Sequence, residues 1–410
     1  MLSRVSGTGF SFAVQGRGGG RARAGEITTP HGVIRTPAFI PVGTKATVKA
    51  VLPEAMDELG AQAILANAYH LYLQPGADIV EAAGGLGPFM NWSGPTFTDS
   101  GGFQVLSLGA GFKKVLAMDS GHRDDDVIAE GKERLARVDD DGVTFRSHLD
   151  GSEHRFTPEV SMQVQAAIGA DIIFAFDELT TLNNTLDYQV ASLERTRLWA
   201  ERCITEHDRL RAADRHYQAL FGVIQGAQYE DLRRKAAGDL GRMDFDGYGI
   251  GGAIEKVNLA EIVGWVTDEL PDDRPRHLLG IGEPSDLFAG VAAGADTFDC
   301  VSPSREARNS AVYSPDGRFN LLTSAHRRAF EPIDVDCDCY TCRHYTRAYL
   351  HHAFKAKEMI ASTLATIHNI RFTVRLVDDM RAAILAGDFA ALQTEFLGRY
   401  SAGTRAASRA

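Results

Sequence analysis

Eight short apolar segments recur along the chain, and amphipathic helical stretches separate most of them. The apolar segments cover residues 37–43, 63–71, 96–104, 171–178, 219–226, 248–252, 277–282 and 296–301. Helical periodicity is found at residues 159–169, 189–213, 229–243, 259–270 and 284–293, and a further helical stretch begins at Pro53. Strands that are apolar nearly throughout and alternate with helices indicate a parallel sheet covered on its outside. Because eight such strands close a barrel, the sequence predicts an α/β fold, a (β/α)₈ TIM barrel.

The alternative is a doubly wound open sheet, but no Gly-rich dinucleotide-binding sequence follows the first strand. In a barrel, the carboxyl ends of the strands form the active face. Polar residues and glycines end several of the predicted strands, so they should meet at one mouth although they span 200 positions. These residues are Asp99, Asp177, Gln225, Gly251, Gly252, Gly280, Ile281, Gly282 and Asp299.

The last strand carries one carboxylate, Asp299, between Phe298 and Cys300. A carboxylate is costly to bury without a partner or a task, so Asp299 is a candidate nucleophile. Arg305 and Arg308 follow within nine residues and suit a polyanion lying across the mouth. The alternative is a strand-end Asp that caps the next turn, followed by two solvated arginines.

Charge is distributed unevenly between two predicted parts of the chain. The protein carries a net charge of -11, but residues 301–410 hold 15 Lys and Arg against 11 Asp and Glu, a net +4. Residues 1–300 hold 28 against 43, a net -15. We therefore expect a catalytic barrel over 1–300 and a polyanion-contacting segment within 301–410, which also supplies a metal-binding subdomain and the helices that complete the barrel.

Two further segments lie within the barrel part. Residues 109–141 contain nine acids and six bases and predict a solvated insertion beside the mouth, with a catalytic lid as the alternative. Residues 142–149 alternate like an extra edge strand. The chain has no apolar stretch long enough to span a bilayer, and its start lacks the apolar core of a signal peptide, so we expect a cytoplasmic location and no membrane partner.

Three of the five cysteines crowd into six positions: Cys337, Cys339 and Cys342. This is metal-ligand spacing, one ligand short of a closed tetrahedral zinc site. His351, His352 and His368 are candidates for the fourth ligand, whereas His344 is too close to Cys342. Four protein ligands would make a Zn²⁺ ion structural, holding together a part too small to build its own core.

Several long motifs occur in a fixed order. They are Thr29-Pro30-His31-Gly32, Thr98-Asp99-Ser100-Gly101-Gly102-Phe103-Gln104, Phe145-Arg146-Ser147-His148-Leu149-Asp150-Gly151, Phe298-Asp299-Cys300-Val301, and the Cys-x-Cys-x-x-Cys cluster with His368-Asn369. Through these motifs the chain resembles the bacterial tRNA-guanine transglycosylase family, and the resemblance covers about Phe10 to Leu397 of this sequence. The resemblance implies a zinc-bearing (β/α)₈ barrel that exchanges the base at tRNA position 34 in queuosine biosynthesis.

The resemblance also assigns roles to residues. It makes Asp299 the nucleophile and Asp99 the general acid and base. The residues expected to bind the base are Asp99, Ser100, Gly101, Gly102, Phe103, Asp177, Gln225 and Gly252. Those expected to contact RNA are Gly280, Ile281, Gly282, Glu283, Pro284, Ser285, Asp286, Ser304, Arg305, Glu306, Ala307 and Arg308. The zinc ligands would be Cys337, Cys339, Cys342 and His368, with one structural zinc per subunit of a homodimer.

The implied chemistry is a double displacement on the anticodon loop. A carboxylate attacks C1′ of the nucleotide, and the incoming base then displaces the covalent ribosyl-enzyme. Residues 251–256 are shorter than the usual pocket-floor run, and Phe103 stands where a tyrosine is common. The incoming base is therefore 7-aminomethyl-7-deazaguanine, the bacterial default, or queuine.

Three other functions fit parts of the sequence. A non-catalytic tRNA-binding partner subunit is disfavoured because both Asp99 and Asp299 are present. A nucleoside or glycoside hydrolase would leave the arginine pair and the zinc cluster unexplained. Modification of DNA in place of tRNA stays open, because contacts to 2′-hydroxyl groups cannot be read from a sequence.

Overall fold

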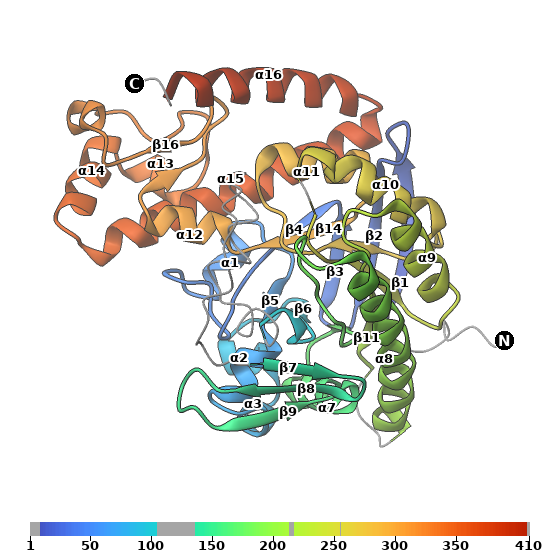
Figure 1. Ribbon diagram of the computed structural model, residues 1–410. Helices are drawn as coiled ribbons and strands as arrows, with labels where there is room; N and C mark the ends of the chain where they lie inside the picture. The colour runs from blue at the N-terminus through green and yellow to red at the C-terminus, as the bar shows by residue number, and fades with distance from the viewer. Residues whose placement is uncertain (1–8, 105–135, 213–216, 255, 408–410) are drawn as a thin grey trace.

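The computed structural model describes residues 9–104, 136–212, 217–254 and 256–407 (Figure 1). At its centre is a parallel sheet of eight strands in the order β4-β14-β13-β12-β11-β10-β6-β5. Val42 and Leu65 form a parallel bridge between the two outermost strands, and the Gly43 N–H donates to the Leu65 carbonyl at 2.7 Å. The strands are β4 (Ala38–Pro41), β5 (Ile64–Ala66), β6 (Thr96–Thr98), β10 (Ile172–Phe174), β11 (Ala219–Ile224), β12 (Gly247–Ile250), β13 (Arg276–Leu278) and β14 (Thr297–Cys300). The predicted eight-stranded barrel is confirmed.

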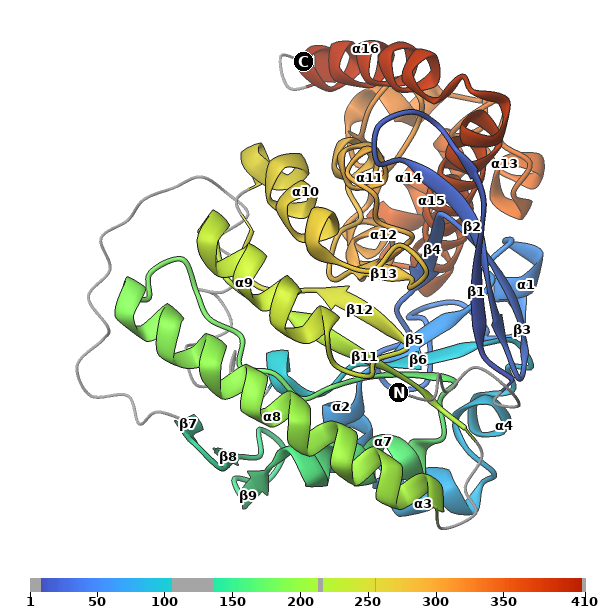
Figure 2. The same cartoon turned by 90° about the vertical axis from the view of Figure 1, so that its right-hand side faces the viewer.

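Helices cover the outside of the barrel, and each predicted amphipathic stretch overlaps one of them (Figure 2). They are α7 (Pro158–Ile168), α8 (Leu186–Ala212), α9 (Glu230–Gly241), α10 (Leu259–Glu269) and α11 (Pro284–Ala292). The long helix α15 (Met359–Ala386) contacts β4 and covers the barrel where the chain closes on itself. Shorter helices and turns complete the outer layer: α1 (Ala55–Glu58), α2 (Ala68–Leu73), α3 (Ala77–Ala82), α4 (Leu86–Met90) and η2 (Lys256–Asn258).

A small antiparallel sheet closes the amino-terminal end of the barrel. It consists of β1 (Ser11–Arg17), β2 (Arg23–Thr29) and β3 (Gly32–Thr36). Ile27 and Ile34 of this sheet are fully buried in one apolar cluster with barrel residues such as Phe221. Arg23 pairs with Asp296 at 2.6 Å, both side chains fully buried. Since this end is sealed, the carboxyl ends of the strands form the open face.

A second antiparallel sheet lies after β6 and corrects one prediction. It contains β7 (Ala136–Asp139), β8 (Gly142–Arg146) and β9 (Glu153–Phe156), with β8 in the middle. The expected edge strand at 142–149 is therefore a central strand, because short segments on both sides pair with it. Most of the predicted insertion at 109–141 lies outside the described residues, and its last part belongs to β7 and the turn to β8.

The chain beyond β14 forms a lobe beside the barrel that includes α12, α13 and α14 (Figure 1). Its elements are α12 (Ser302–Arg308), β15 (Ala311–Val312), β16 (Phe319–Asn320), η3 (Ser324–Arg328), α13 (Tyr340–His344), α14 (Arg347–Lys355) and α16 (Phe389–Ala407), together with α15. Ala307, Leu321, Leu350 and Leu364 belong to its own buried cluster, which also contains the three cysteines. Across the described residues, no helix combines the length and apolar character needed to cross a membrane.

Candidate active site and metal centre

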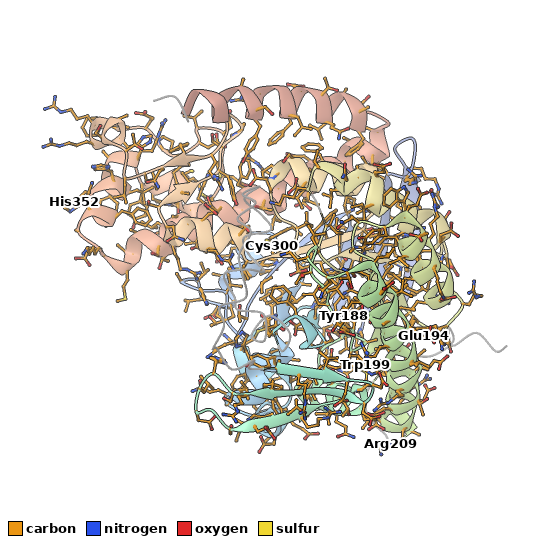
Figure 3. All side chains as sticks on the ribbon, viewed as in Figure 1. Tyr188, Glu194, Trp199, Arg209, Cys300 and His352 are labelled. Atoms are coloured by element: carbon orange, nitrogen blue, oxygen red, sulfur yellow. The ribbon has the colours of Figure 1, made fainter. Side chains whose placement is uncertain are left out.

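The open end of the barrel gathers polar groups from several strands. Asp99 follows β6 directly, Asp177 follows β10, and Gln225 follows β11. The Ser100 hydroxyl donates to Asp177 Oδ1 at 3.0 Å, and the Gln225 side-chain amide donates to Asp177 Oδ2 at 2.6 Å. Residues predicted from three separate strands thus form one hydrogen-bonded group. Cys300, which follows Asp299 in β14, lies near the middle of the molecule (Figure 3).

Asp99 is held by the residues that follow the adjacent strand β5. The Asn67 side-chain amide donates to its Oδ2 at 2.5 Å, and the Ala68 N–H donates to its Oδ1 at 2.8 Å. The enclosing protein raises the pKa of Asp99 to about 6, because burial disfavours the charged form more than these donors favour it, and the charge of Asp299 raises it further. A carboxyl group with such a pKa can both give and take a proton near neutral pH.

Asp177 is almost completely buried, and burial raises its pKa to about 6 against the hydrogen bonds from Gln225 and Ser100. The backbone of the Gly-Gly pair runs close to it. A Cβ atom at Gly102 would lie 2.7 Å from the Asp177 carbonyl oxygen, so no larger residue fits there. Acceptors and donors enclosed in this way can pair with the polar edge of a flat heterocycle.

The pocket floor also requires glycine at position 252. Gly252 has a φ of +91°, and a Cβ atom there would lie 2.6 Å from Gln225 Oε1. Phe103, by contrast, remains 40% exposed after the Gly-Gly turn. Its ring therefore offers a face on which a base can stack.

Asp299 is held by two donors that converge on one oxygen. His277 Nε2 lies 3.0 Å from Asp299 Oδ1, and the Gly280 N–H donates to the same oxygen at 2.9 Å. The His277 side chain is fully buried, while the Asp299 side chain keeps 14% of its surface exposed. Gly280, predicted to contact RNA, therefore also holds the candidate nucleophile through its backbone.

Arg233 is a site residue that sequence reasoning missed. This fully buried guanidinium donates to the carbonyl oxygens of Ala227 at 2.8 Å, Ile224 at 3.2 Å and Gly251 at 2.7 Å. Burial lowers its pKa to about 9. It ties the ends of β11 and β12 together beneath Gln225 and Gly252. A helical pattern places an arginine outward, so no signal in the sequence marked it.

Four cations form what we term the basic cluster: Lys45, Lys49, Arg305 and Arg308. Burial lowers the pKa of Lys49, and the positive charges of Arg308, Arg305 and Lys45 lower it further. None of the four pairs with an acidic side chain within the part of the chain that the structure describes. The two lysines follow β4 and the arginines follow β14, its neighbour in the barrel. Lys45 and Lys49 were not predicted, since only their position after a strand could have marked them.

The remaining predicted RNA-contacting residues divide into exposed and enclosed groups. Gly280 and Ser285 are exposed, and Ile281 is half-buried. Glu283 accepts a hydrogen bond from the Tyr400 hydroxyl at 2.9 Å, and Asp286 lies 3.5 Å from Lys256. The other enclosed residues are Gly282, Pro284, Ser304 and Ala307, whereas Glu306 is half-buried and lies 3.3 Å from Arg318.

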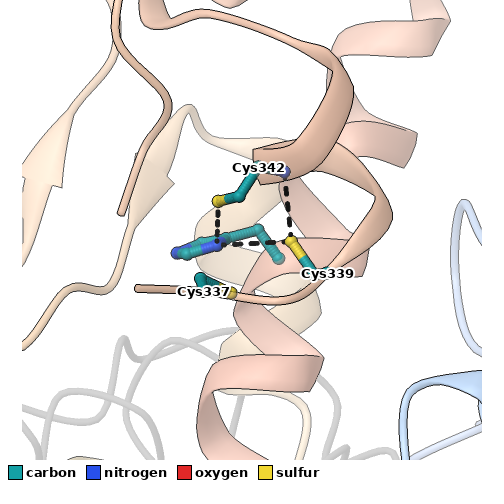
Figure 4. A group of neighbouring side chains, drawn as sticks. Cys337, Cys339 and Cys342 are labelled. Carbon is teal, nitrogen blue, oxygen red and sulfur yellow. Dashed lines mark hydrogen bonds between the residues drawn. The ribbon is translucent and has the colours of Figure 1, made fainter. Parts of the chain in front are cut away.

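The metal centre brings together Cys337, Cys339, Cys342 and His368, whose ligand atoms all lie within 4.8 Å of one another (Figure 4). His368 Nδ1 lies 3.3 Å from Cys342 Sγ, and its Nε2 lies 2.7 Å from the Tyr313 carbonyl oxygen. That carbonyl accepts the Nε2 proton and leaves Nδ1 free to ligate. Three thiolates and one imidazole in this arrangement fit a metal ion, and the donor set suits zinc.

The other histidine candidates are engaged elsewhere. His351 Nδ1 lies 2.8 Å from the Leu321 carbonyl oxygen. The sequence disfavoured His344 as a ligand. Its Nδ1 lies 2.8 Å from the Tyr340 carbonyl oxygen. His352 is exposed at the outer edge of the lobe (Figure 3).

Comparison with known proteins gives matches along nearly the whole chain. The family model described as queuine tRNA-ribosyltransferase matches residues 18–402. A queuine tRNA-ribosyltransferase of Symbiobacterium thermophilum is 47% identical over 385 residues, covering 93% of this chain and 89% of the relative. Those of Desulforamulus reducens and Herpetosiphon aurantiacus are each 45% identical, covering 93% and 95% of this chain and 96% and 94% of the relatives.

Proposed function

Because the chain belongs to the queuine tRNA-ribosyltransferase family, we propose that it replaces guanine at wobble position 34 of tRNAs with GUN anticodons by 7-aminomethyl-7-deazaguanine. As a tRNA-guanine transglycosylase it acts on the anticodon loop without cutting the RNA chain. The exchange proceeds by double displacement through a covalent ribosyl-enzyme, and it serves queuosine biosynthesis.

The observation that carries this proposal is the pairing of two unlike carboxylates at one barrel mouth. Asp299 is partly exposed and held through one oxygen, which suits a nucleophile that attacks C1′. Asp99 has a pKa raised to about 6, which suits a group that protonates the departing guanine and then accepts a proton from the incoming base. Two inversions at C1′ preserve the anomeric configuration.

Base recognition falls to the buried group around Asp177. Its carboxylate accepts hydrogen bonds, and Gln225 beside it supplies both an amide donor and an amide oxygen. Guanine and 7-deazaguanine share the amide and amino edge that such groups can read. Phe103 stacks on the base from the exposed side.

The tRNA backbone meets the basic cluster. Four cations without acidic partners among the described residues lie beside the nucleophile strand. Phosphate contacts of this kind orient the RNA without selecting a base. A nucleotide splayed out of its stack can then enter the pocket.

The metal centre holds one Zn²⁺ ion per subunit, and this ion is structural. Four protein ligands leave no position for a substrate or an activated water. The proposal includes a homodimer, as the family resemblance implies. Large apolar side chains are exposed on the metal-bearing lobe, among them Phe330, Val335 and Met359, and they offer a surface for a second copy.

Incubation of the protein with labelled guanine and either total tRNA or duplex DNA tests the activity. We expect label to enter tRNA only. Addition of unlabelled 7-aminomethyl-7-deazaguanine should then release the label and block its return, whereas queuine should release it far more slowly. Release by queuine alone would make this a salvage enzyme. Failure of guanine to enter tRNA would contradict the proposed function.

A further inference from the structure

His277 is a fully buried ionisable residue packed among aromatic side chains of the barrel. Its ring centroid lies 5.6 Å from that of Phe97 and 5.2 Å from that of Phe174. Its two ring nitrogens face two residues of the neighbouring strand β14. Nδ1 lies 2.8 Å from Thr297 Oγ1, and Nε2 lies 3.0 Å from Asp299 Oδ1. A fully buried histidine therefore contacts the proposed nucleophile directly.

The hydrogen-bonding partners define the tautomer of His277. An ionised carboxylate only accepts hydrogen bonds, so Nε2 must carry a proton to bond with Asp299. A hydroxyl group can donate, so Thr297 Oγ1 can supply a proton to an unprotonated Nδ1. The neutral imidazole with its proton on Nε2 satisfies both contacts, and it places no net charge between two phenyl rings.

The two carboxylate oxygens of Asp299 accept different numbers of hydrogen bonds. Oδ1 accepts from both His277 Nε2 and the Gly280 N–H. Oδ2 accepts no hydrogen bond from any residue that the structure describes. A carboxylate oxygen that already accepts two hydrogen bonds is the weaker nucleophile, because those bonds stabilise its lone pairs.

We propose that His277 is a positioning residue that, with Thr297 behind it, turns Asp299 so that Oδ2 is the oxygen that attacks the nucleotide. This inference rests on the proposed function and names the atom that performs its first step. Oδ2 forms a bond to C1′ while the bond from C1′ to the base nitrogen breaks. The electron pair of that bond leaves with guanine, which takes a proton from Asp99. His277 itself keeps its proton throughout.

Three substitutions separate positioning from packing. In His277→Gln the side-chain amide places an N–H donor at about the position of Nε2, so it can still donate to Asp299. In His277→Asn the shorter side chain places its amide at about the position of Nδ1 and cannot contact Asp299. His277→Phe fills the space without any donor. We expect His277→Gln to keep kcat for guanine exchange within about 3-fold, and His277→Asn and His277→Phe to lower it on the order of 10- to 100-fold. KM for tRNA should be unchanged in all three.

A second pair of variants tests the same arrangement without altering His277. Thr297→Val removes the hydroxyl group that orients the ring, while Thr297→Ser keeps it. We expect a several-fold lower kcat for Thr297→Val and a value near the parent for Thr297→Ser. This pair decides the question if a His277 variant does not fold, as judged by thermal unfolding and metal content.

The pH profile of kcat distinguishes positioning from proton transfer. If His277 only positions Asp299, kcat of His277→Asn should be lower than that of the parent by the same factor at every pH, so that the shape of the profile does not change. Loss of one limb of the profile would show that His277 transfers a proton and would overturn the proposal. It would equally be overturned if His277→Asn matched the parent, or if His277→Gln fell as far as His277→Asn. A parent protein that exchanges no guanine would instead contradict the proposed function.

Discussion

The side-chain amide of Asn369 donates a hydrogen bond to the Pro303 carbonyl oxygen at 3.1 Å, which ties helix α15 to the start of helix α12. The same amide donates to the Ala311 carbonyl at 3.0 Å, and Asn369 Oδ1 accepts from the Tyr313 N–H at 3.1 Å. Its neighbour in sequence is the proposed metal ligand His368. Two consecutive residues of α15 therefore join the metal centre to the helix that carries Arg305 and Arg308.

Replacing Asn369 by alanine should weaken tRNA binding while the metal stays bound. The substitution leaves three backbone groups, two of them buried, without their partner, which costs roughly 1–3 kcal/mol of unfolding free energy for each buried group left unsatisfied. The start of α12 loses its anchor, and the arginines lose their fixed position. Zinc content, thermal unfolding and tRNA affinity should be measured together. Asp379→Asn on an exposed part of α15 serves as the control, and equal tRNA affinity in both variants would disprove this coupling.

Replacing Cys339 by alanine should lower zinc content and thermal stability together. In the proposed structural site, three thiolates and one imidazole hold the lobe through the metal, so loss of one ligand should remove binding energy that contributes to folding. Cys203→Ala is a matched control, since Cys203 is also buried but lies outside the cluster. That control should lose some stability through packing and keep its zinc. A metal-free Cys339→Ala protein as stable and active as the parent would show that the metal is not structural.

Replacing Asp299 by asparagine should abolish both base exchange and covalent trapping of tRNA. Asparagine can still accept from His277 and Gly280 through Oδ1, so the fold should be unchanged. The amide nitrogen then stands where the attacking oxygen would be, and it has no free lone pair to give. Trapping is measured as a tRNA-protein species on a denaturing gel. A substantial residual exchange rate would exclude Asp299 as the nucleophile.

The barrel could be predicted from the sequence because buried parallel strands leave a strong signal. A segment such as Ala219–Ile224 is apolar throughout and is followed directly by the polar residue Gln225, so strand, burial and site position follow from one pattern. The motifs carrying Asp99 and Asp299 added a family resemblance. The pattern failed at β7 and β9, because these strands are rich in polar residues and only partly buried, and so β8 was taken for an edge strand.

The contacts that position the site could not be predicted, because they join residues far apart in sequence. Asn67 is 32 residues from Asp99, and His277 is 22 residues from Asp299. His277 looks like one polar residue in an apolar strand, and nothing local shows which residue it faces. Arg233 lies on a helix whose other arginine, Arg234, is partly exposed and paired with acids. Only the packing of α9 against β11 and the hydrogen bonds of Arg233 to backbone carbonyls distinguish the two.

Base binding should weaken as pH falls through about 6. The pKa values of Asp99 and Asp177 are both raised to about 6, and the ionised form of Asp177 is the stronger acceptor for the hydrogen bonds proposed from the base. Raised pKa values mean that the folded state holds protons more tightly than the unfolded state. The resulting stabilisation is therefore fully present below about pH 4 and is lost as pH rises through about 6.

Asp177→Asn isolates this effect because it removes the charge and keeps the size. Relative to the parent, the variant should gain thermal stability above pH 6, and the difference should disappear toward pH 4. Its base affinity should be low and independent of pH. Melting temperatures and the KM for guanine, measured from pH 4 to 8, provide the test. Parallel melting curves for the two proteins would show that Asp177 is not buried as a charge.

The last prediction concerns Arg305 and Arg308, which lie on α12 directly after the strand of the proposed nucleophile and belong to the basic cluster. Burial and the charge of Arg305 lower the pKa of Arg308, and no acidic side chain among the described residues neutralises either arginine. Phosphate groups flanking the target nucleotide are therefore the partners expected at this edge of the mouth. Such contacts position an RNA substrate but do not choose a base.

The double variant Arg305→Ala/Arg308→Ala should weaken tRNA binding and reduce the slope of log affinity against log salt by about two units at most. The preference among guanine, 7-aminomethyl-7-deazaguanine and queuine should not change. The control is the double variant Arg209→Ala/Arg242→Ala, which changes the net charge by the same amount. Both residues lie at the carboxyl ends of their helices, at the end of the barrel opposite the mouth, and Arg209 is far from Cys300 (Figure 3). This control should bind tRNA like the parent. If both double variants lost equal affinity, net charge and not position would explain the effect. If base preference changed while tRNA affinity held, the arginines would belong to the base pocket, and the RNA would have to cross the mouth on another side.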